Sequence, residues 1–303
     1  MKIDYITFVK IMKILITGIF GQIGWNLAHI ARINGHHVVG TYHTHLVESS
    51  FRVHRLGLMP ENLETGLLSL PFVPDAILHC AAYTNVDKAE SEKPKAMDIN
   101  ARSSNFMVSY ARKIGAKLIY LSTDYVFDGQ VGGYNELSIP SPRGVYGLSK
   151  LLGEAPVLAY EQGFVLRFTP LGHGIRLPHH PLSLMDWVLK CARDGKKAPM
   201  FFNRTSSPVS SQDLWEVISE ILSDKQNQPL LHVHSDIKDL MQIGREIERA
   251  FGLCHTTTYG FLSHNSYSKI RPFKAHLSSN FTQPASLLKS LEKLRQQRKS
   301  YEF

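Results

Sequence analysis

The chain has 303 residues, 43% of them hydrophobic and 20% charged, with a formal net charge of +8 at pH 7. This length suffices for one large domain or for a main domain with a smaller annex. No apolar run approaches the roughly 18 residues that cross a bilayer, and Asp4 and Lys10 interrupt the apolar first residues, which argues against a secretory signal. We therefore expect a cytoplasmic protein without membrane contact. Apart from a C-terminal cluster the basic residues are scattered, so nucleic acid is not an expected partner.

The first half of the chain alternates compact apolar runs with helical patterns. Residues 13–18 form an apolar run that ends in glycine and predicts a buried strand, and residues 22–35 follow with apolar side chains at helical spacing. The further predicted elements are strands at 36–42, 75–83 and 116–127 and a helix at 100–115. Because each strand is apolar and alternates with helices, the pattern predicts a parallel sheet covered on both faces.

The second half of the chain is less regular. A helix is predicted from Tyr146 to about residue 162, and an apolar strand follows at 164–168. Residues 170–181 are rich in Pro, Gly and His and predict an irregular loop. Two later helices are predicted at 213–222 and 237–251. The boundary between the regular part and an annex is expected near residue 170, and residues 1–11 are interpreted as an N-terminal extension.

Histidines and cysteines do not form a recognisable metal-binding pattern. The chain has 15 histidines and 3 cysteines. No histidine pair lies beside a second ligand pair such as H-E-x-x-H or C-x-x-C, and the cysteines are far apart. We expect neither a metal site nor a disulfide framework.

Three glycines, Gly18, Gly21 and Gly24, follow the first predicted strand and open the first predicted helix. Glycine permits a tight turn there and lets a pyrophosphate approach backbone N–H groups at a helix N-terminus, which favours an anion. Strand, turn and helix occur in the order that this site requires, so we predict dinucleotide binding. The G-x-x-G-x-x-G spacing resembles that of the short-chain dehydrogenase/reductases.

Tyr146 and Lys150 lie four positions apart in VYGLSK (145–150), and on a helix they share one face. A nearby ammonium group stabilises a phenolate, so the pair predicts a tyrosine of lowered pKa that exchanges protons near neutral pH. The alternative is an ordinary first helical turn with a packed tyrosine and a solvated lysine. Thr123, at the end of a predicted strand, precedes the pair at the interval that short-chain dehydrogenase/reductases show, and this resemblance favours the catalytic interpretation.

The resemblance narrows to the dTDP-4-dehydrorhamnose reductase branch of the extended short-chain family. It is carried by AAYTNVDKAE (81–90), INA (99–101), LSTDYVFDG (121–129) and YGLSKLLGE (146–154). It is dense from residue 13 to 168 and continues in SSPVSSQDLW (206–215) and RPFKAHLSS (271–279). The fold that it implies is a Rossmann-type doubly wound parallel sheet over residues 12–170. A smaller, mostly helical substrate-binding region over 171–303 follows, with room for part of it to return to the first domain.

The same resemblance implies reduction of the 4-keto group of a nucleotide-linked 6-deoxysugar, with a nucleotide-diphosphate sugar as the partner and NAD(P)H as the cofactor. Tyr146 would donate a proton to the carbonyl oxygen, and Thr123 would hydrogen-bond that oxygen. Lys150 would hold the nicotinamide ribose and lower the tyrosine pKa. The implied cofactor-binding residues are Gly18, Phe20, Gly21, Gln22, Ile23, Gly24, His43, Ala81, Ala82, Tyr83 and Lys150.

For several other residues the sequence allows two interpretations. Asp124 and Tyr125 would face the sugar, although Asp124 is equally suited to capping the turn at the end of the strand. Asn100 would brace the active-site helix or begin a helix as its cap. Arg204 and Arg271 are candidate diphosphate ligands, because a guanidinium binds phosphate in a bidentate manner, or they are surface arginines. A homodimer is one alternative for the oligomeric state.

The chain departs from the family pattern in two places. The second predicted strand ends in GTYHTH (40–45), without the acidic residue that accepts from a ribose 2′-hydroxyl. His43, Thr44 and His45 stand there instead, so we favour NADPH over NADH. The loop at 170–181 lacks the aromatic residue that contacts the sugar in the family, which predicts a rebuilt sugar pocket.

Two rival functions stay open. The non-catalytic NADP-binding regulatory subunit of methionine adenosyltransferase also resembles this family, and the complete set of Thr123, Tyr146 and Lys150 argues against it. Nucleotide-sugar epimerases and dehydratases share the fold. Dehydratases carry Thr-Asp-Glu at the end of the fifth strand, whereas this chain has Tyr125 at the position of the glutamate, which favours simple reduction.

Overall fold

The computed structural model describes residues 10–174, 182–254, 256–260 and 270–300. Most of the N-terminal extension lies outside this part of the chain. Met12 is buried, and its backbone N–H donates to Nδ1 of His36 at 3.2 Å. The described structure therefore begins directly at the first strand of the sheet.

A parallel sheet of seven strands forms the main body, in the order β3-β2-β1-β4-β5-β6-β9. The strand order reverses between β1 and β4, which is the arrangement of a doubly wound sheet with its binding crevice at the reversal. The predicted Rossmann-type fold is therefore confirmed. The strands are β1 (Lys13–Thr17), β2 (His37–Tyr42), β3 (Arg52–Arg55), β4 (Ala76–His79), β5 (Lys117–Leu121), β6 (Gly163–Arg167) and β9 (Leu230–His232).

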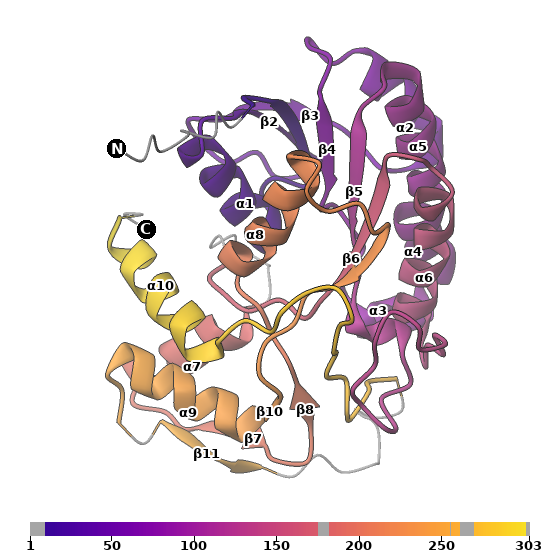
Figure 1. The fold of residues 1–303 in the computed structure, drawn as a ribbon. Helices are drawn as coiled ribbons and strands as arrows, with labels where there is room; N and C mark the ends of the chain where they lie inside the picture. Colours follow the sequence, from indigo (N-terminus) through magenta and orange to yellow (C-terminus); the bar gives the residue numbers. More distant parts are fainter. Residues whose placement is uncertain (1–9, 175–181, 255, 261–269, 301–303) are drawn as a thin grey trace, which may run out of the picture.

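Helices cover both faces of the sheet (Figure 1). On one face lie α1 (Gln22–Ile33) and α8 (Ser211–Leu222), which pack on Ile14 and Ile16. On the other face lie α2 (Pro60–Leu68), α5 (Ser103–Ile114) and α6 (Val145–Leu158), around Leu15 and Ile77. Successive side chains of one strand point to opposite faces, which is why both faces need apolar residues.

Short helices connect the sheet to the site. They are α3 (Val86–Ser91), α4 (Lys93–Met97), the π-helix η1 (Asp98–Arg102) and the 3-10 helix η2 (Asp124–Val126). The predicted strands 75–83 and 116–127 therefore end early, at His79 and Leu121, because the chain then turns to form the site. The predicted helix 100–115 begins inside η1 and continues as α5.

The C-terminal part of the chain divides between two places. Strand β9 pairs with β6 in the main sheet, and α8 packs in the core that α1 shares, so this part of the chain returns to the first domain. The remainder forms a lobe with its own core around Met185, Ile243 and Leu291 (Figure 1). The elements of this C-terminal lobe are α7 (Leu184–Arg193), β7 (Ala198–Phe201), β8 (Thr205–Ser206), β10 (Lys238–Asp239), α9 (Leu240–Phe251), β11 (Thr257–Gly260) and α10 (Leu287–Ser300).

The helix predicted at 237–251 begins later, at Leu240. Asp239 accepts from the backbone N–H of Gln242 while the Gln242 side chain accepts from the backbone N–H of Asp239, which is a capping box. The residues before it pair with β8 as strand β10. No helix within the described ranges is long and apolar enough to span a membrane.

Candidate active site

The glycine turn between β1 and α1 is as tight as the sequence predicts. Gly18 has a φ of +65°, and a Cβ there would lie 2.8 Å from Cα of Ala81. A Cβ on Gly24 would lie 2.4 Å from the carbonyl oxygen of Gly18. Gly21 precedes α1 as its N-cap and donates to the carbonyl oxygen of Gly18 at 2.9 Å. The first turn of α1 therefore presents bare backbone beside the end of β4, a cradle that fits the pyrophosphate of a dinucleotide.

The other residues of this turn take different positions. Phe20 is buried against Trp25 and Tyr42, so only its backbone belongs to the turn. The Gln22 side chain donates to the carbonyl oxygen of Gly172 at 3.2 Å and joins the turn to the loop after β6. Ile23 is partly buried against the core.

The end of β4 is tied to both the glycine turn and α6. The Ala81 N–H donates to Oγ1 of Thr17 at 3.1 Å. Asn100 is 1% exposed; its Oδ1 accepts from the backbone N–H of Tyr83 at 2.7 Å, and its Nδ2 donates to Oγ of Ser149 at 2.9 Å. Asn100 therefore braces α6, and the alternative of a helix cap is wrong. Ala82 lies between the two tied residues and is partly buried.

Small residues allow α6 to approach the site closely. A Cβ on Gly147 would lie 2.2 Å from the carbonyl oxygen of Tyr125, and one on Gly153 would lie 2.3 Å from that of Asn100. The first turn of α6 is capped from α3, because Oε1 of Glu90 accepts from the backbone N–H of Val145 at 2.7 Å. These contacts fix the helix that carries Tyr146 and Lys150.

Thr123 and Tyr146 come from two adjoining elements, η2 and α6. Thr123 is the N-cap of η2, accepts from the backbone N–H of Tyr125 at 3.2 Å, and is 5% exposed. Its side chain lies close enough to that of Tyr146 to lower the pKa of the phenol, against the effect of burial. The ring of Tyr125 packs edge-on against Tyr146, with centroids 5.6 Å apart. A hydroxyl pair at the carboxyl end of β5 is thus available to one oxygen atom of a substrate.

The predicted lowering of the tyrosine pKa is wrong for this structure. Burial raises the pKa of Tyr146 above its ordinary value, the neighbouring Thr123 hydroxyl opposes this, and the nearby Asp124 adds to it. Lys150 is 2% exposed, and its Nζ lies 3.9 Å from the centroid of the Tyr120 ring. Burial lowers the pKa of Lys150 to about 7. The lysine therefore titrates near neutrality, while the tyrosine stays a phenol.

The residues predicted to face the substrate differ in how close they lie to the site. Asp124 is 1% exposed and accepts from Oγ1 of Thr123 at 3.1 Å, and burial raises its pKa. Arg204 reaches the site from the C-terminal lobe, donating to the Tyr125 hydroxyl at 3.0 Å. Arg271 forms a bidentate ion pair with Asp87 of α3, at 2.6 and 2.7 Å. Arg204 thus lies beside the site, and Arg271 is held by a carboxylate.

At the far end of the sheet, His43 follows β2 and is exposed. Arg55, the last residue of β3, donates from Nε to the carbonyl oxygen of His43 at 3.1 Å. A guanidinium and an imidazole thus stand where many Rossmann folds carry an acidic residue. The sequence has no acidic residue at 43–45 or at 55–59, and this absence is the signal that points to a site for a phosphate.

Three residues with close contacts to the site were not predicted from the sequence to have a role in it. Glu90 caps α6, and Glu154 and Arg167 form a buried ion pair beneath it. Glu90 and Glu154 end the two motifs AAYTNVDKAE and YGLSKLLGE, so their place in those motifs is the signal that was available. Arg167 lies inside an apolar strand, where a charge needs a partner.

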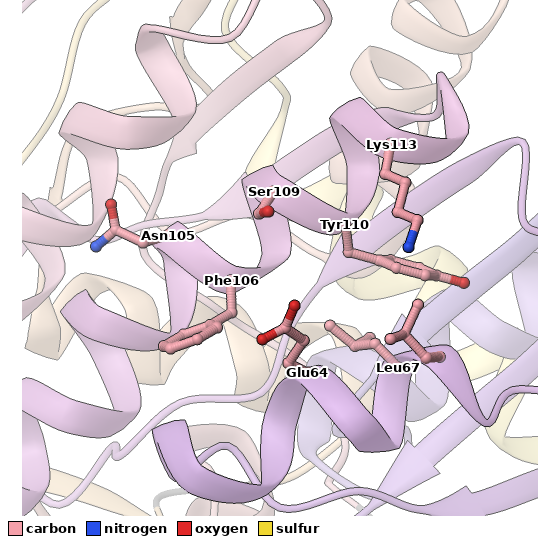
Figure 2. Close-up of a pocket in the computed structure, with 8 residues that line it drawn as sticks. Glu64, Leu67, Asn105, Phe106, Ser109, Tyr110 and Lys113 are labelled. Atoms are coloured by element: carbon pink, nitrogen blue, oxygen red, sulfur yellow. The ribbon is translucent and has the colours of Figure 1, made fainter.

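A cavity of about 220 Å³ lies between α2 and α5 and is separate from this site. Figure 2 shows Glu64 of α2 directed toward α5, between Phe106 and Tyr110. None of the predicted site residues lines it. Within the described ranges, no cluster of three or more His, Cys, Asp or Glu side chains is arranged to hold a metal ion.

Known proteins resemble this chain in sequence. Agl14 of Haloferax volcanii, a probable low-salt glycan biosynthesis reductase, is 29% identical over 213 residues, covering 70% of this chain and 71% of that protein. Methionine adenosyltransferase 2 subunit beta of Xenopus laevis is 36% identical over 162 residues, covering 54% and 47%. The dTDP-4-dehydrorhamnose reductase of Mycobacterium tuberculosis is 35% identical over 152 residues, covering 48% and 46%. The match spans about half the length of the last two proteins.

Solved structures share the whole fold. A hypothetical dTDP-4-dehydrorhamnose reductase from Sulfolobus tokodaii superposes with a TM-score of 0.75 at 29% identity, covering 92% of this chain and 99% of that one. A dTDP-4-dehydrorhamnose reductase from Bacillus anthracis in complex with NADP gives a TM-score of 0.78 at 23% identity, covering 95% and 98%. The family model of the RmlD substrate binding domain matches residues 12–294. Fold, site and match agree, and the chain belongs to the RmlD substrate-binding domain family.

Proposed function

We propose that this protein is an NADPH-dependent reductase of the 4-keto group of a nucleotide-linked 6-deoxysugar. The observation that carries the proposal is the pair of neighbouring hydroxyl groups of Thr123 and Tyr146, with buried Lys150 one helical turn further on. The pair is joined to the glycine cradle through Asn100 and the end of β4. Relatives of this chain include proteins named as dTDP-4-dehydrorhamnose reductases.

The proposed chemistry divides proton and hydride between protein and cofactor. A bound nicotinamide supplies the hydride. The raised pKa of Tyr146 keeps its hydroxyl protonated at neutral pH, which is the form that donates to a carbonyl oxygen. Thr123 would turn its hydroxyl from Asp124 to that oxygen, donate a second hydrogen bond to it and orient it. Lys150, as an ammonium ion, binds the ribose hydroxyls and stabilises the phenolate that forms when the proton leaves.

The residues beside this pair suit the nucleotide part of the substrate. Arg204 and the Tyr125 hydroxyl form one polar edge of the site. Arg271, already paired with Asp87, would exchange this carboxylate for a diphosphate, which offers the same bidentate geometry. We therefore assign the diphosphate to the side of the site formed by the C-terminal lobe, within residues 171–303.

The cofactor preference is part of the proposal. Arg55 places a cation beside His43 beyond β2, which favours the 2′-phosphate of NADPH. One structural relative is in complex with NADP, and another, MoeE5, is in complex with NAD. Comparing the dissociation constants of NADPH and NADH by fluorescence titration tests the preference, and tighter binding of NADH would contradict it.

A regulatory role is the second candidate, because a methionine adenosyltransferase regulatory subunit is 36% identical to part of this chain. The experiment that separates the two offers NADPH with a panel of dTDP-, GDP- and UDP-linked 4-keto-6-deoxysugars and follows absorbance of the reduced nicotinamide. We expect oxidation of NADPH with at least one of the dTDP sugars. NADPH binding without turnover on the whole panel would contradict the reductase and favour the regulatory role.

A further inference from the structure

A buried ion pair lies beneath the active-site helix and is not used by the proposed chemistry. Arg167 ends β6 and Glu154 lies on α6, and their side chains are 4% and 2% exposed. Arg167 Nε donates to Oε1 of Glu154 at 3.0 Å, and a terminal nitrogen of the guanidinium donates to Oε2 at 2.5 Å. Oγ of Ser122 donates to Oε1 at 2.5 Å. The carboxylate of Glu154 therefore joins α6 to the ends of β5 and β6.

The opposite side of the guanidinium is satisfied by a histidine. Nδ1 of His232 lies 3.0 Å from the carbonyl oxygens of both Tyr134 and Ser278, which only accept hydrogen bonds. Nδ1 therefore carries the proton, and Nε2 accepts from Arg167 at 3.4 Å. The guanidinium also lies 5.3 Å from the centroid of the Phe127 ring. These contacts account for Arg167, but they give no reason why its partner should be a carboxylate on α6.

The position of Glu154 relative to Lys150 supplies that reason. Glu154 follows Lys150 by four residues, so the two lie on one face of α6. Ser122, which donates to the carboxylate, directly precedes Thr123, so the same group also holds the end of β5. One side chain is thus linked to two residues with proposed roles in the reaction, Lys150 and Thr123.

Glu154 is the carboxylate among the titratable side chains that the structure describes near Lys150. Within the described part of the chain, the titratable side chains near Lys150 come from α6, β5 and the segment that ends β4; they are Glu154, Tyr146, Tyr120, His79 and Cys80. Burial lowers the pKa of His79 to about 3 and raises that of Cys80 to about 12, so both are neutral at pH 7. Burial also raises the pKa of both tyrosines. Of the neighbouring groups, the carboxylate of Glu154 does most to raise the pKa of Lys150, against the lowering that burial causes.

We propose that Glu154 is a positioning residue of the active site, whose carboxylate holds α6 against β5 and supplies the negative charge that keeps Lys150 an ammonium ion. The inference deepens the proposed function and rests on it, because it takes Lys150 to bind the nicotinamide ribose. A purely structural ion pair is replaceable by apolar side chains of similar volume without loss of fold. The two roles therefore differ in what happens to Lys150 when the negative charge is removed.

The test measures the dissociation constant of NADPH by fluorescence between pH values of about 6 and 9.5, a range that brackets the titration of a perturbed lysine. The main variant is the double substitution Glu154→Gln with Arg167→Met, which leaves no unpaired buried charge. Ser122→Ala is the matched control, because it removes a hydrogen bond to Glu154 and keeps the charge. Thermal unfolding monitored by circular dichroism establishes that each variant is folded.

We expect NADPH binding by the wild type to weaken above a break in the pH profile, where Lys150 loses its proton. In the double variant this break moves to lower pH by about one unit, which weakens binding about ten-fold between the two breaks. Ser122→Ala keeps the wild-type break. Glu154→Gln alone removes the carboxylate and leaves the Arg167 cation, which keeps its proton, so its break moves to lower pH and tests the inference independently if the double variant does not fold.

The outcomes separate this inference from the function on which it rests. A folded double variant with the wild-type break would overturn the role of Glu154 and leave the reductase proposal standing. A break in folded Glu154→Gln that stays in place or moves to higher pH would also overturn it. A wild-type protein that does not bind NADPH at any pH would overturn both proposals.

Discussion

A methyl group added at Gly147 tests whether the close approach of α6 to η2 sets the geometry of the site. The Cβ of Gly147→Ala would lie 2.2 Å from the carbonyl oxygen of Tyr125, which is 1.2 Å short of the 3.4 Å at which ordinary contact begins. The obstructing atom belongs to the backbone of η2, directly after Thr123, so no side-chain rotation relieves the overlap. Either α6 or η2 must move by about 1 Å.

Two opposing contributions set the expected loss of stability. Alanine is favoured over glycine inside a helix by about 1 kcal/mol, whereas overpacking costs about 1–3 kcal/mol. We expect the free energy of unfolding to fall by up to about 2 kcal/mol. A displacement of about 1 Å between Thr123 and Tyr146 should lower kcat about 100-fold, because proton transfer depends on their alignment.

Urea denaturation and NADPH oxidation measure the two effects. Gly66→Ala in α2 is the matched control: its Cβ would lie 2.4 Å from Cδ1 of Leu56, the end of a flexible side chain, which shifts at less cost than backbone. We expect the control to keep both stability and turnover. Wild-type stability and turnover in Gly147→Ala would refute the reasoning that contact with η2 fixes the site.

Three further predictions concern catalysis, cofactor and pH. Tyr146→Phe should lower kcat by at least about 100-fold while NADPH affinity is kept; retained turnover would remove Tyr146 from the role of acid. Arg55→Ala should weaken NADPH binding about ten-fold and leave NADH binding unchanged, and an equal loss for both would contradict the assignment of the 2′-phosphate. Burial lowers the pKa of His29 to about 4 and of His79 to about 3, below the ordinary 6.5. The unfolded chain therefore binds protons that the folded protein does not, and the free energy of unfolding should fall as the pH decreases from about 6.5 towards 4. Equal urea midpoints at pH 7 and pH 5 would contradict this.

Much of the fold was predictable because its signals are local. The strand, glycine turn and helix from Lys13 to Ile33 appear in the sequence within one short segment, and the structure confirms their order. The elements that were not predicted are helices such as α2 and α7 and several strands that are short or depend on partners. Strand β9 has three residues and is defined by its pairing with β6, and β10 by its pairing with β8. No periodicity is readable in such short segments.

The sequence by itself determined which groups could form the site: the glycine cradle, and a threonine, a tyrosine and a lysine at fixed intervals. The tertiary structure decided how those groups behave. Burial leaves Tyr146 a phenol and brings Lys150 close to neutrality, and distant segments supply Asp87 to Arg271 and Arg167 to Glu154. Spacing along one helix specifies neighbours four residues apart, whereas desolvation and ion pairing depend on chain segments that meet only in the fold.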